Sequence, residues 1–142
     1  MDACAFTLTL PSQSRMLSVA RAFVEAVCGA HQFDPSLTHS LVLVTGEAFT
    51  NVVRHAHRDV PHAQVEIRLQ VLADAVTLVF RDQGAPFDLT TVPSLAPGDL
   101  RIGGRGVYLI RALMDEVSCH PRTDRSGNVL RMVKRLRSLA AG

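Results

Sequence analysis

Hydrophobic and polar residues alternate in some stretches of the chain and follow helical spacing in others. Residues 5–10, "AFTLTL", alternate and stop at Pro11, which predicts a strand. Residues 14–30 and about 34–55 have apolar positions at helical spacing, which predicts two helices, with Ser14 as the N-cap of the first. The apolar stripe of the first helix consists of Leu17, Ala20, Val24 and Val27, and that of the second consists of Leu37, Leu41, Val44, Ala48 and Val52.

The rest of the chain predicts a hairpin, a long loop, one more helix and two more strands. Alternation over residues 65–71 and 76–80 predicts a hairpin with one buried face. Residues 84–104 contain repeated Gly and Pro, which predicts little regular structure. The later helix and strands are predicted over residues 106–116, 117–122 and 129–137. This order mixes hairpins with helices, so it favours an α+β two-layer sandwich over a doubly wound sheet.

Composition narrows the class of protein. A chain of 142 residues suits a single domain over residues 1–142, and a hydrophobic content of 47% supports a real core. The 15 basic and 13 acidic residues give a net charge of +2, which is too balanced to favour direct binding of nucleic acid or of a membrane surface. No signal peptide or membrane-spanning run is evident, and the three Cys residues lack disulfide or zinc spacing. We therefore expect a cytoplasmic protein.

The stretch "GEAFTNVVRHAH", residues 46–57, places polar side chains in a helix that is otherwise apolar. Glu47 and Asn51 are one turn apart, and they share a helix face with Leu43 and Arg54. Taken alone, this spacing favours a solvated Glu47 and a satisfied Asn51, because E-x-x-x-N occurs often by chance. The stretch becomes informative only in combination with others.

Two further stretches indicate a ligand site. In "RDQGAPFD", residues 81–88, Asp82 follows a predicted strand and can accept a hydrogen bond from an amino group, while Gly84 permits close approach of the backbone. In "GGRGVYLIRAL", residues 103–113, a Gly-rich turn enters a helix N-terminus, where free N–H groups favour phosphate oxygens. An ordinary turn and a flexible hinge are the alternatives. The Gly-rich turn lacks the P-loop pattern, and no βαβ unit frames it.

Together, and in this order, the three stretches resemble the N, G1 and G2 boxes of the GHKL ATPase superfamily, which has the Bergerat ATP-binding fold. Within it, "GEAFTNVVRHAH", "RDQGAPFD" and "GGRGVYLIRALMDEV" are similar to the boxes of the small bacterial anti-sigma-factor serine kinases. The resemblance spans nearly the whole chain. It implies a protein serine/threonine kinase with a mixed, mainly antiparallel sheet.

The resemblance also implies roles for individual residues. Asn51 would bind the Mg²⁺ that bridges the ATP phosphates, and Glu47 would be the general base. Asp82 would hold the adenine amino group, with Gly84 admitting the base. The other residues implied at the nucleotide are Arg54, His55, Phe87, Gly103, Gly104, Arg105, Gly106 and Val107. The chain departs from the family at Gly46, where Ser is frequent, at Val52, where a small residue is usual, and in a short segment between residues 88 and 103.

The implied partners are a sigma factor and an anti-anti-sigma factor, a STAS-type antagonist that the kinase would phosphorylate. A homodimer is also implied. Some residues outside the core stripes offer physical support, because apolar residues there often mark a protein contact. These are Arg15, Phe23 and Cys28 on the first helix, and Phe6, Thr7 and Thr9 on the first strand, although packing beneath the sheet would explain Phe6 as well.

Two other functions compete with this interpretation. One is a nucleotide-dependent binding module without kinase turnover, against which the presence of Glu47 and Asn51 argues. The other is the ATP-binding domain of a histidine kinase. That function needs a phosphoacceptor-His hairpin upstream, and we expect no room for one in this chain.

Overall fold

The computed structural model describes residues 3–56, 60, 62–85, 105–124 and 126–136. In chain order the strands and helices are β1 (Cys4–Pro11), α1 (Leu17–Ala30), α2 (Pro35–Asn51), β2 (Gln64–Val71), β3 (Ala75–Arg81), α3 (Arg105–Leu113), β4 (Glu116–Pro121) and β5 (Asn128–Arg135). A 3₁₀ turn, Ser14–Met16, precedes α1, and a π-helical turn, Val52–Ala56, follows α2. None of the helices in these ranges is long and apolar enough to span a bilayer.

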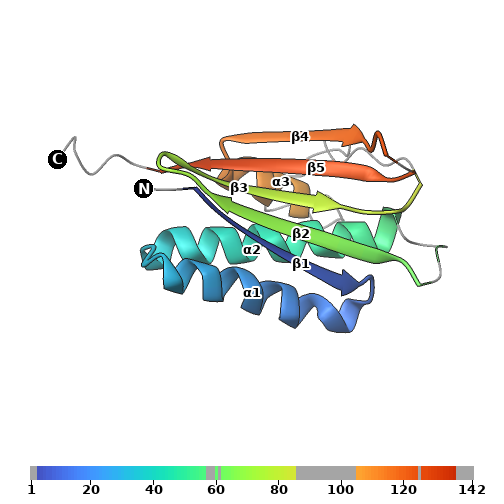
Figure 1. Ribbon diagram of the computed structural model, residues 1–142, viewed down its shortest axis with the longest axis horizontal. Helices are drawn as coiled ribbons and strands as arrows, with labels where there is room; N and C mark the ends of the chain where they lie inside the picture. Colours follow the sequence, from blue (N-terminus) through green and yellow to red (C-terminus); the bar gives the residue numbers. More distant parts are fainter. Residues whose placement is uncertain (1–2, 57–59, 61, 86–104, 125, 137–142) are drawn as a thin grey trace.

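The strands form one sheet in the order β1-β2-β3-β5-β4, and the helices lie along one of its faces (Figure 1). The predicted α+β two-layer arrangement is therefore confirmed. The sequence indicated a mixed, mainly antiparallel sheet, and all four pairings between the described strands are antiparallel. Strand β5 pairs with β3, so the last strand lies inside the sheet and β4 lies at its edge.

The core lies between the helices and the sheet. Val65, Ile67 and Leu69 of β2 are fully buried, whereas Arg68 on the same strand is exposed, as the alternating pattern predicts. The register pairs Leu69 with Leu78, and Leu78 with Met132. Side chains of neighbouring strands therefore form continuous rows beneath the helices, which fixes the register of the sheet.

The first helix begins later than the sequence suggests. Ser14 was expected to cap it, but residues Ser14–Met16 form a 3₁₀ turn and α1 starts at Leu17. The N-cap residue of α1 is Met16, which makes no side-chain capping hydrogen bond, so the assignment of Ser14 as N-cap is wrong. The 3₁₀ turn supplies local backbone bonds at this helix end instead of a side-chain cap.

Cys28 corrects a second expectation about α1. It was assigned to the outer side of the helix, yet its side chain is fully buried in the core. Burial raises the pKa of the Cys28 thiol, so it stays protonated and packs as a small hydrophobic residue. Phe23 and Phe6 also pack against the core, and the Phe6 ring meets that of His31 edge-on. The exposed side of α1 carries small residues together with Arg21 and Glu25, and Val19 is the one large apolar side chain exposed in the described ranges.

Helix α2 begins where the sequence predicts. The Asp34 side chain accepts a hydrogen bond of 2.7 Å from the backbone N–H of Leu37, and Pro35 occupies the first helical position. The start of α2 thus has a side-chain cap, unlike that of α1.

Replacing Asp34 with Ala is expected to lower the free energy of unfolding by about 1 kcal/mol, because the Leu37 N–H loses its acceptor at the helix start. Urea unfolding followed by circular dichroism measures the change. The Asp34→Asn variant keeps a capping oxygen and should lose much less. Equal losses in both variants would contradict the capping role.

Candidate functional site

Glu47 and Asn51 occupy the last turn and a half of α2 and are both partly buried. The Asn51 Nδ2 donates a hydrogen bond of 2.9 Å to the Glu47 backbone carbonyl. This bond fixes the orientation of the Asn51 amide. Within the described ranges no group donates to the Asn51 Oδ1, so the carbonyl-type oxygen that could ligate a cation is left available.

Helix α3 reaches this pair through Gly106. A Cβ added at Gly106 would lie 2.5 Å from the Glu47 Oε2 and 3.3 Å from the Asn51 Nδ2. Only Gly leaves the space that the Glu47 carboxyl group occupies. The contact brings the first turn of α3, with its free backbone N–H groups, beside both side chains. A helix N-terminus in this position favours phosphate oxygens.

The π-helical turn after α2 positions the next two candidates. Arg54 and His55 lie in this turn, and both are exposed. Wide turns of this kind are frequent at functional sites because they re-aim side chains without ending the helix. Val52, in the same turn, is buried in the core, which accounts for a larger residue at this position.

Asp82 follows β3 and is only 4% exposed. Its Oδ1 accepts a hydrogen bond of 2.9 Å from the Gly84 N–H, which turns the chain sharply after the strand. Gly84 is buried as well. A buried carboxylate that keeps its hydrogen bonds is the kind of group that recognises an amino group on a planar ligand.

One narrow cavity connects the two halves of the site. Its lining residues are Ala48, Asn51, Val52, Asp82, Cys119, Asn128 and Leu130. Asn51 and Asp82 both line it, and the remaining surface is mainly apolar. Its volume is about 10 Å³, the size of one water, so it marks where these side chains converge and is not itself a space for a ligand. Sequence reasoning missed Cys119, Asn128 and Leu130, because they come from β4 and β5 and belong to none of the recognised motifs.

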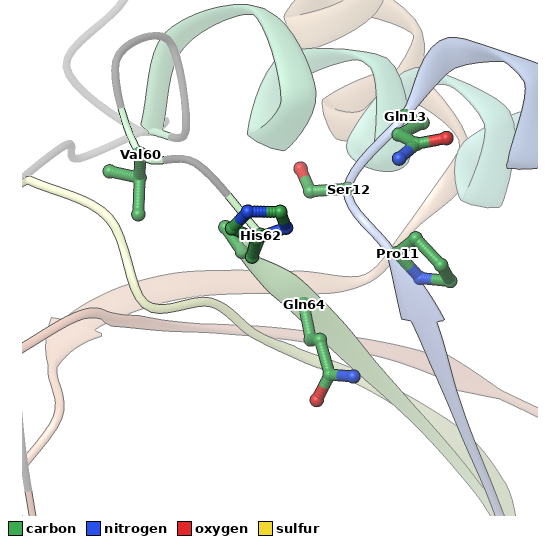
Figure 2. A pocket seen from close by; sticks show the side chains of 7 residues that line it. Pro11, Ser12, Gln13, Val60, His62 and Gln64 are labelled. Atoms are coloured by element: carbon green, nitrogen blue, oxygen red, sulfur yellow. The ribbon is translucent and has the colours of Figure 1, made fainter.

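A larger hollow of about 460 Å³ lies elsewhere (Figure 2). Its lining residues are Pro11, Ser12, Gln13, Val60, His62, Ala63 and Gln64. Val60 and His62 lie on one side of it, and Ser12 and Gln13 on the other. It shares no lining residue with the cavity between Asn51 and Asp82, and none of the predicted site residues lines it.

The remaining predicted site residues fall into two groups. Phe87, Gly103 and Gly104 lie outside the described residues. Arg105 is the first residue of α3, and Val107 is only 2% exposed, within the core. The Val107 side chain therefore anchors the helix, and its backbone N–H remains the part that could meet a ligand.

Gly46, the departure from the family pattern beside Glu47, has a structural explanation. The Arg21 guanidinium of α1 lies directly against it: a Cβ on Gly46 would be 2.8 Å from the Arg21 Nε. The missing side chain therefore makes room for an arginine between the two helices. Because the end of an arginine can move, this contact is adjustable and differs from the one at Gly106.

The domain has two layers and an α+β fold. A Glu–Asn pair lies on one helix, a glycine of the next helix lies against it, and a buried carboxylate lies at a strand end. This combination is typical of a GHKL ATPase domain. Residues 10–134 match the histidine kinase-like ATPase domain family, and the chain belongs to it. A serine-protein kinase RsbW of Oceanobacillus iheyensis is 30% identical over 118 residues, covering 78% of this chain and 75% of the relative. The Bacillus subtilis protein of the same name is 28% identical over 137 residues, covering 91% and 84%. The resemblance to the anti-sigma-factor serine kinases is thus confirmed.

Proposed function

We propose that the protein is an ATP-dependent serine/threonine kinase that binds a sigma factor and phosphorylates a STAS-type anti-anti-sigma factor. The observation that carries the proposal is the contact of Gly106 with Glu47 and Asn51, joined by one cavity to Asp82. It brings together a candidate base, a candidate metal ligand, a helix N-terminus and a carboxylate. The relatives named serine-protein kinase support the same activity.

The residues fit ATP and Mg²⁺ by their chemistry. The buried Asp82 carboxylate suits the amino group of an adenine ring, and the start of α3 suits the phosphates. In this proposal Asn51 supplies an oxygen ligand to Mg²⁺, which neutralises phosphate charge. Glu47 accepts the proton of the antagonist hydroxyl, which makes its oxygen a better nucleophile. In this proposal Arg54 and His55, both exposed in the π-helical turn after α2, contact the phosphates.

The partner assignments rest on the family. We propose a cytoplasmic homodimer, with the whole chain acting as one domain. The outer side of α1 and the edge strand β1 are the surfaces we assign to protein contacts. Thr7 and Thr9 are exposed on that edge, where unpaired backbone groups can accept another strand.

A transfer assay tests the proposal. The purified protein is incubated with Mg²⁺, γ-labelled ATP and each STAS-domain protein of the same organism. We expect label on a Ser or Thr of one of them, located by mass spectrometry. ATP binding without transfer to any of these proteins would favour the binding module, and no ATP binding would contradict the proposal as a whole.

Replacing Asn51 with Ala is expected to remove the dependence of ATP affinity on Mg²⁺, because the variant lacks the oxygen ligand. Calorimetry with and without Mg²⁺ measures this in both proteins. The Thr50→Ala variant removes a neighbouring polar side chain of α2 and serves as the control. The metal role is wrong if Mg²⁺ strengthens binding equally in the Asn51→Ala variant and the unmodified protein.

A further inference from the structure

The face of the sheet that points away from the helices has an apolar centre. The described helices lie along one face (Figure 1), and alternate residues of each strand form the other. In an antiparallel sheet, the face that no helix covers usually carries polar residues. Val79 of β3 and Val129 and Val133 of β5 lie on this face instead. Val79 and Val129 are both partly exposed there.

Two exposed arginines flank this centre. The register pairs Val79 with Arg68 of β2 on one side and with Arg131 of β5 on the other. Neighbouring strands are about 4.8 Å apart, so the Cα atoms of the two arginines are about 10 Å apart across the valine. Arg131 also lies between Val129 and Val133 on its own strand. We call Arg68, Val79 and Arg131 the basic row.

The carboxylates on this face already lie beside other arginines. The Glu66 carboxylate is 4.0 Å from the Arg81 guanidinium. The Glu116 carboxylate is 3.6 Å from that of Arg135. Within the part of the chain that the structure describes, neither arginine of the basic row makes a side-chain hydrogen bond or an ion pair. The strands thus place four arginines and two glutamates on this face, and the two unpaired positive charges belong to the basic row.

We propose that this face is a docking surface for an acidic segment of a partner protein, in which two carboxylates pair with Arg68 and Arg131 and an apolar side chain packs on Val79. Arginine pairs with a carboxylate through two parallel hydrogen bonds, which fixes the position of the partner. The apolar centre supplies area to bury, and the charges select the sequence that binds. Glu47 and Asn51 lie on α2, on the other side of the sheet (Figure 1), so a bound segment leaves them accessible.

Two other occupants fit this surface less well. A second copy of the chain would bring two further unpaired positive charges into the same interface, and like charges across an interface are unfavourable. A nucleic acid binds mainly through its phosphates, so the two glutamates and the apolar centre oppose it. A polypeptide that carries both carboxylates and an apolar side chain satisfies the charges and the valines together.

An NMR titration with a synthetic peptide tests the proposal. The probe carries glutamates on both sides of a central leucine, and its control carries glutamines instead. We expect the glutamate peptide to shift the signals of β2, β3 and β5 around the basic row, and the glutamine peptide to bind about 10-fold more weakly. Because salt screens exposed ion pairs, the affinity should fall as ionic strength rises. Equal binding of both peptides, or shifts confined to other elements, would overturn the proposal.

Single variants separate this face from the charge of the whole protein. Arg68→Gln and Arg131→Gln each remove one unpaired charge and should each lower the affinity for the glutamate peptide about 3-fold or more. Arg111→Gln is the matched control, because Arg111 is exposed in the last turn of α3 and its loss changes the net charge by the same amount. It should leave the affinity unchanged. An equal loss in the control would show that the peptide responds only to net charge, which contradicts the proposal.

A charge exchange sharpens the test. The double variant Arg68→Glu with Arg131→Glu should reject the glutamate peptide and bind a peptide with lysines in place of the glutamates. If this variant does not fold, the single glutamine variants decide the question. A change of oligomeric state in any of these variants, measured by analytical ultracentrifugation, would assign the face to a second copy and reject the acidic partner.

A DNA duplex separates the remaining occupant. If the unmodified protein binds the duplex more tightly than the glutamate peptide, and the Arg68→Gln and Arg131→Gln variants lose the duplex, the face belongs to nucleic acid and the proposal is wrong. We expect the opposite preference. None of these measurements requires ATP, so failure of the proposed kinase function leaves this inference intact, and failure of this inference leaves the kinase function intact.

Discussion

Replacing Glu47 with Gln is expected to lower phosphoryl transfer to the antagonist by roughly 10²-fold or more, while ATP affinity stays nearly the same. Gln has the same shape as Glu but cannot accept a proton at neutral pH. The Glu47 Oε2 lies against Gly106, at the start of the helix we assign to the phosphates. The Glu47→Gln variant therefore lacks only the proton acceptor, and the geometry around residue 47 is preserved.

Initial rates of label transfer at saturating ATP measure the effect, and calorimetry measures ATP affinity. Glu66→Gln is the matched control. Glu66 lies on β2, where its carboxylate is 4.0 Å from Arg81 and the two side chains are 40% and 45% exposed, so its loss should leave the rate unchanged. A Glu47→Gln variant that transfers phosphate at the unmodified rate would reject Glu47 as the base.

Much of the site could be predicted because its signals are local in sequence. Glu47 and Asn51 are one turn apart on a helix whose start is marked by Asp34 and Pro35, so their shared face follows from helical geometry. Asp82 follows a strand that alternates clearly, which places it at the strand end. Each of these assignments needs no information about which strands are neighbours.

The residues that sequence reasoning missed depend on strand order. Asn128 meets Asp82 because β5 pairs with β3, and Cys119 reaches the cavity because β4 pairs with β5. Pairing between β3 and β5 brings together segments separated by residues 82–127, which include α3 and β4, and no local pattern encodes it. In the sequence, Asn128 follows Gly127 and is typical of an ordinary turn. The structure places it at the start of β5, where it hydrogen-bonds to Asp82.

The errors in α1 have a related cause. Cys28 falls outside the stripe of four apolar residues that the sequence suggested for α1. It follows the buried Val27 and lies four residues after the buried Val24, so the core face of the helix is wider than that stripe. Ser14 has the right chemistry for a cap, and the 3₁₀ turn that begins there postpones the α-helix to Leu17. Both cases show packing and backbone geometry overriding a residue-type preference.

Gly46, Gly106 and Gly127 differ in what an added side chain would meet. Gly46 faces the movable end of Arg21, Gly127 faces a backbone carbonyl, and Gly106 faces the Glu47 carboxyl group. A side chain at Gly46 would displace an arginine at little cost. At Gly127 it would collide with the backbone and strain the fold. At Gly106 the displaced group is the candidate base itself, so the effect should appear in the rate and not in stability.

Gly106→Ala is therefore expected to lower phosphoryl transfer by about 10²-fold, the size of loss associated with a reacting group misplaced by about 1 Å. The added methyl group would lie 2.5 Å from the Glu47 Oε2, closer than van der Waals contact allows, so the carboxyl group must move. Ala also has the higher helix propensity, so α3 should be no less stable, unless the methyl group displaces α3 and not Glu47.

Transfer rates and urea unfolding, measured on the same preparation, distinguish a displaced Glu47 carboxyl group from a displaced α3. Gly29→Ala is the matched control: Gly29 is also helical, and a Cβ there would meet nothing within 4 Å. It should gain about 0.5 kcal/mol of stability and keep the full rate. A Gly106→Ala variant that loses transfer with unchanged stability supports a Glu47 carboxyl group whose position is set by this one contact. Full activity in the variant would show that the position of the Glu47 carboxyl group does not matter for transfer.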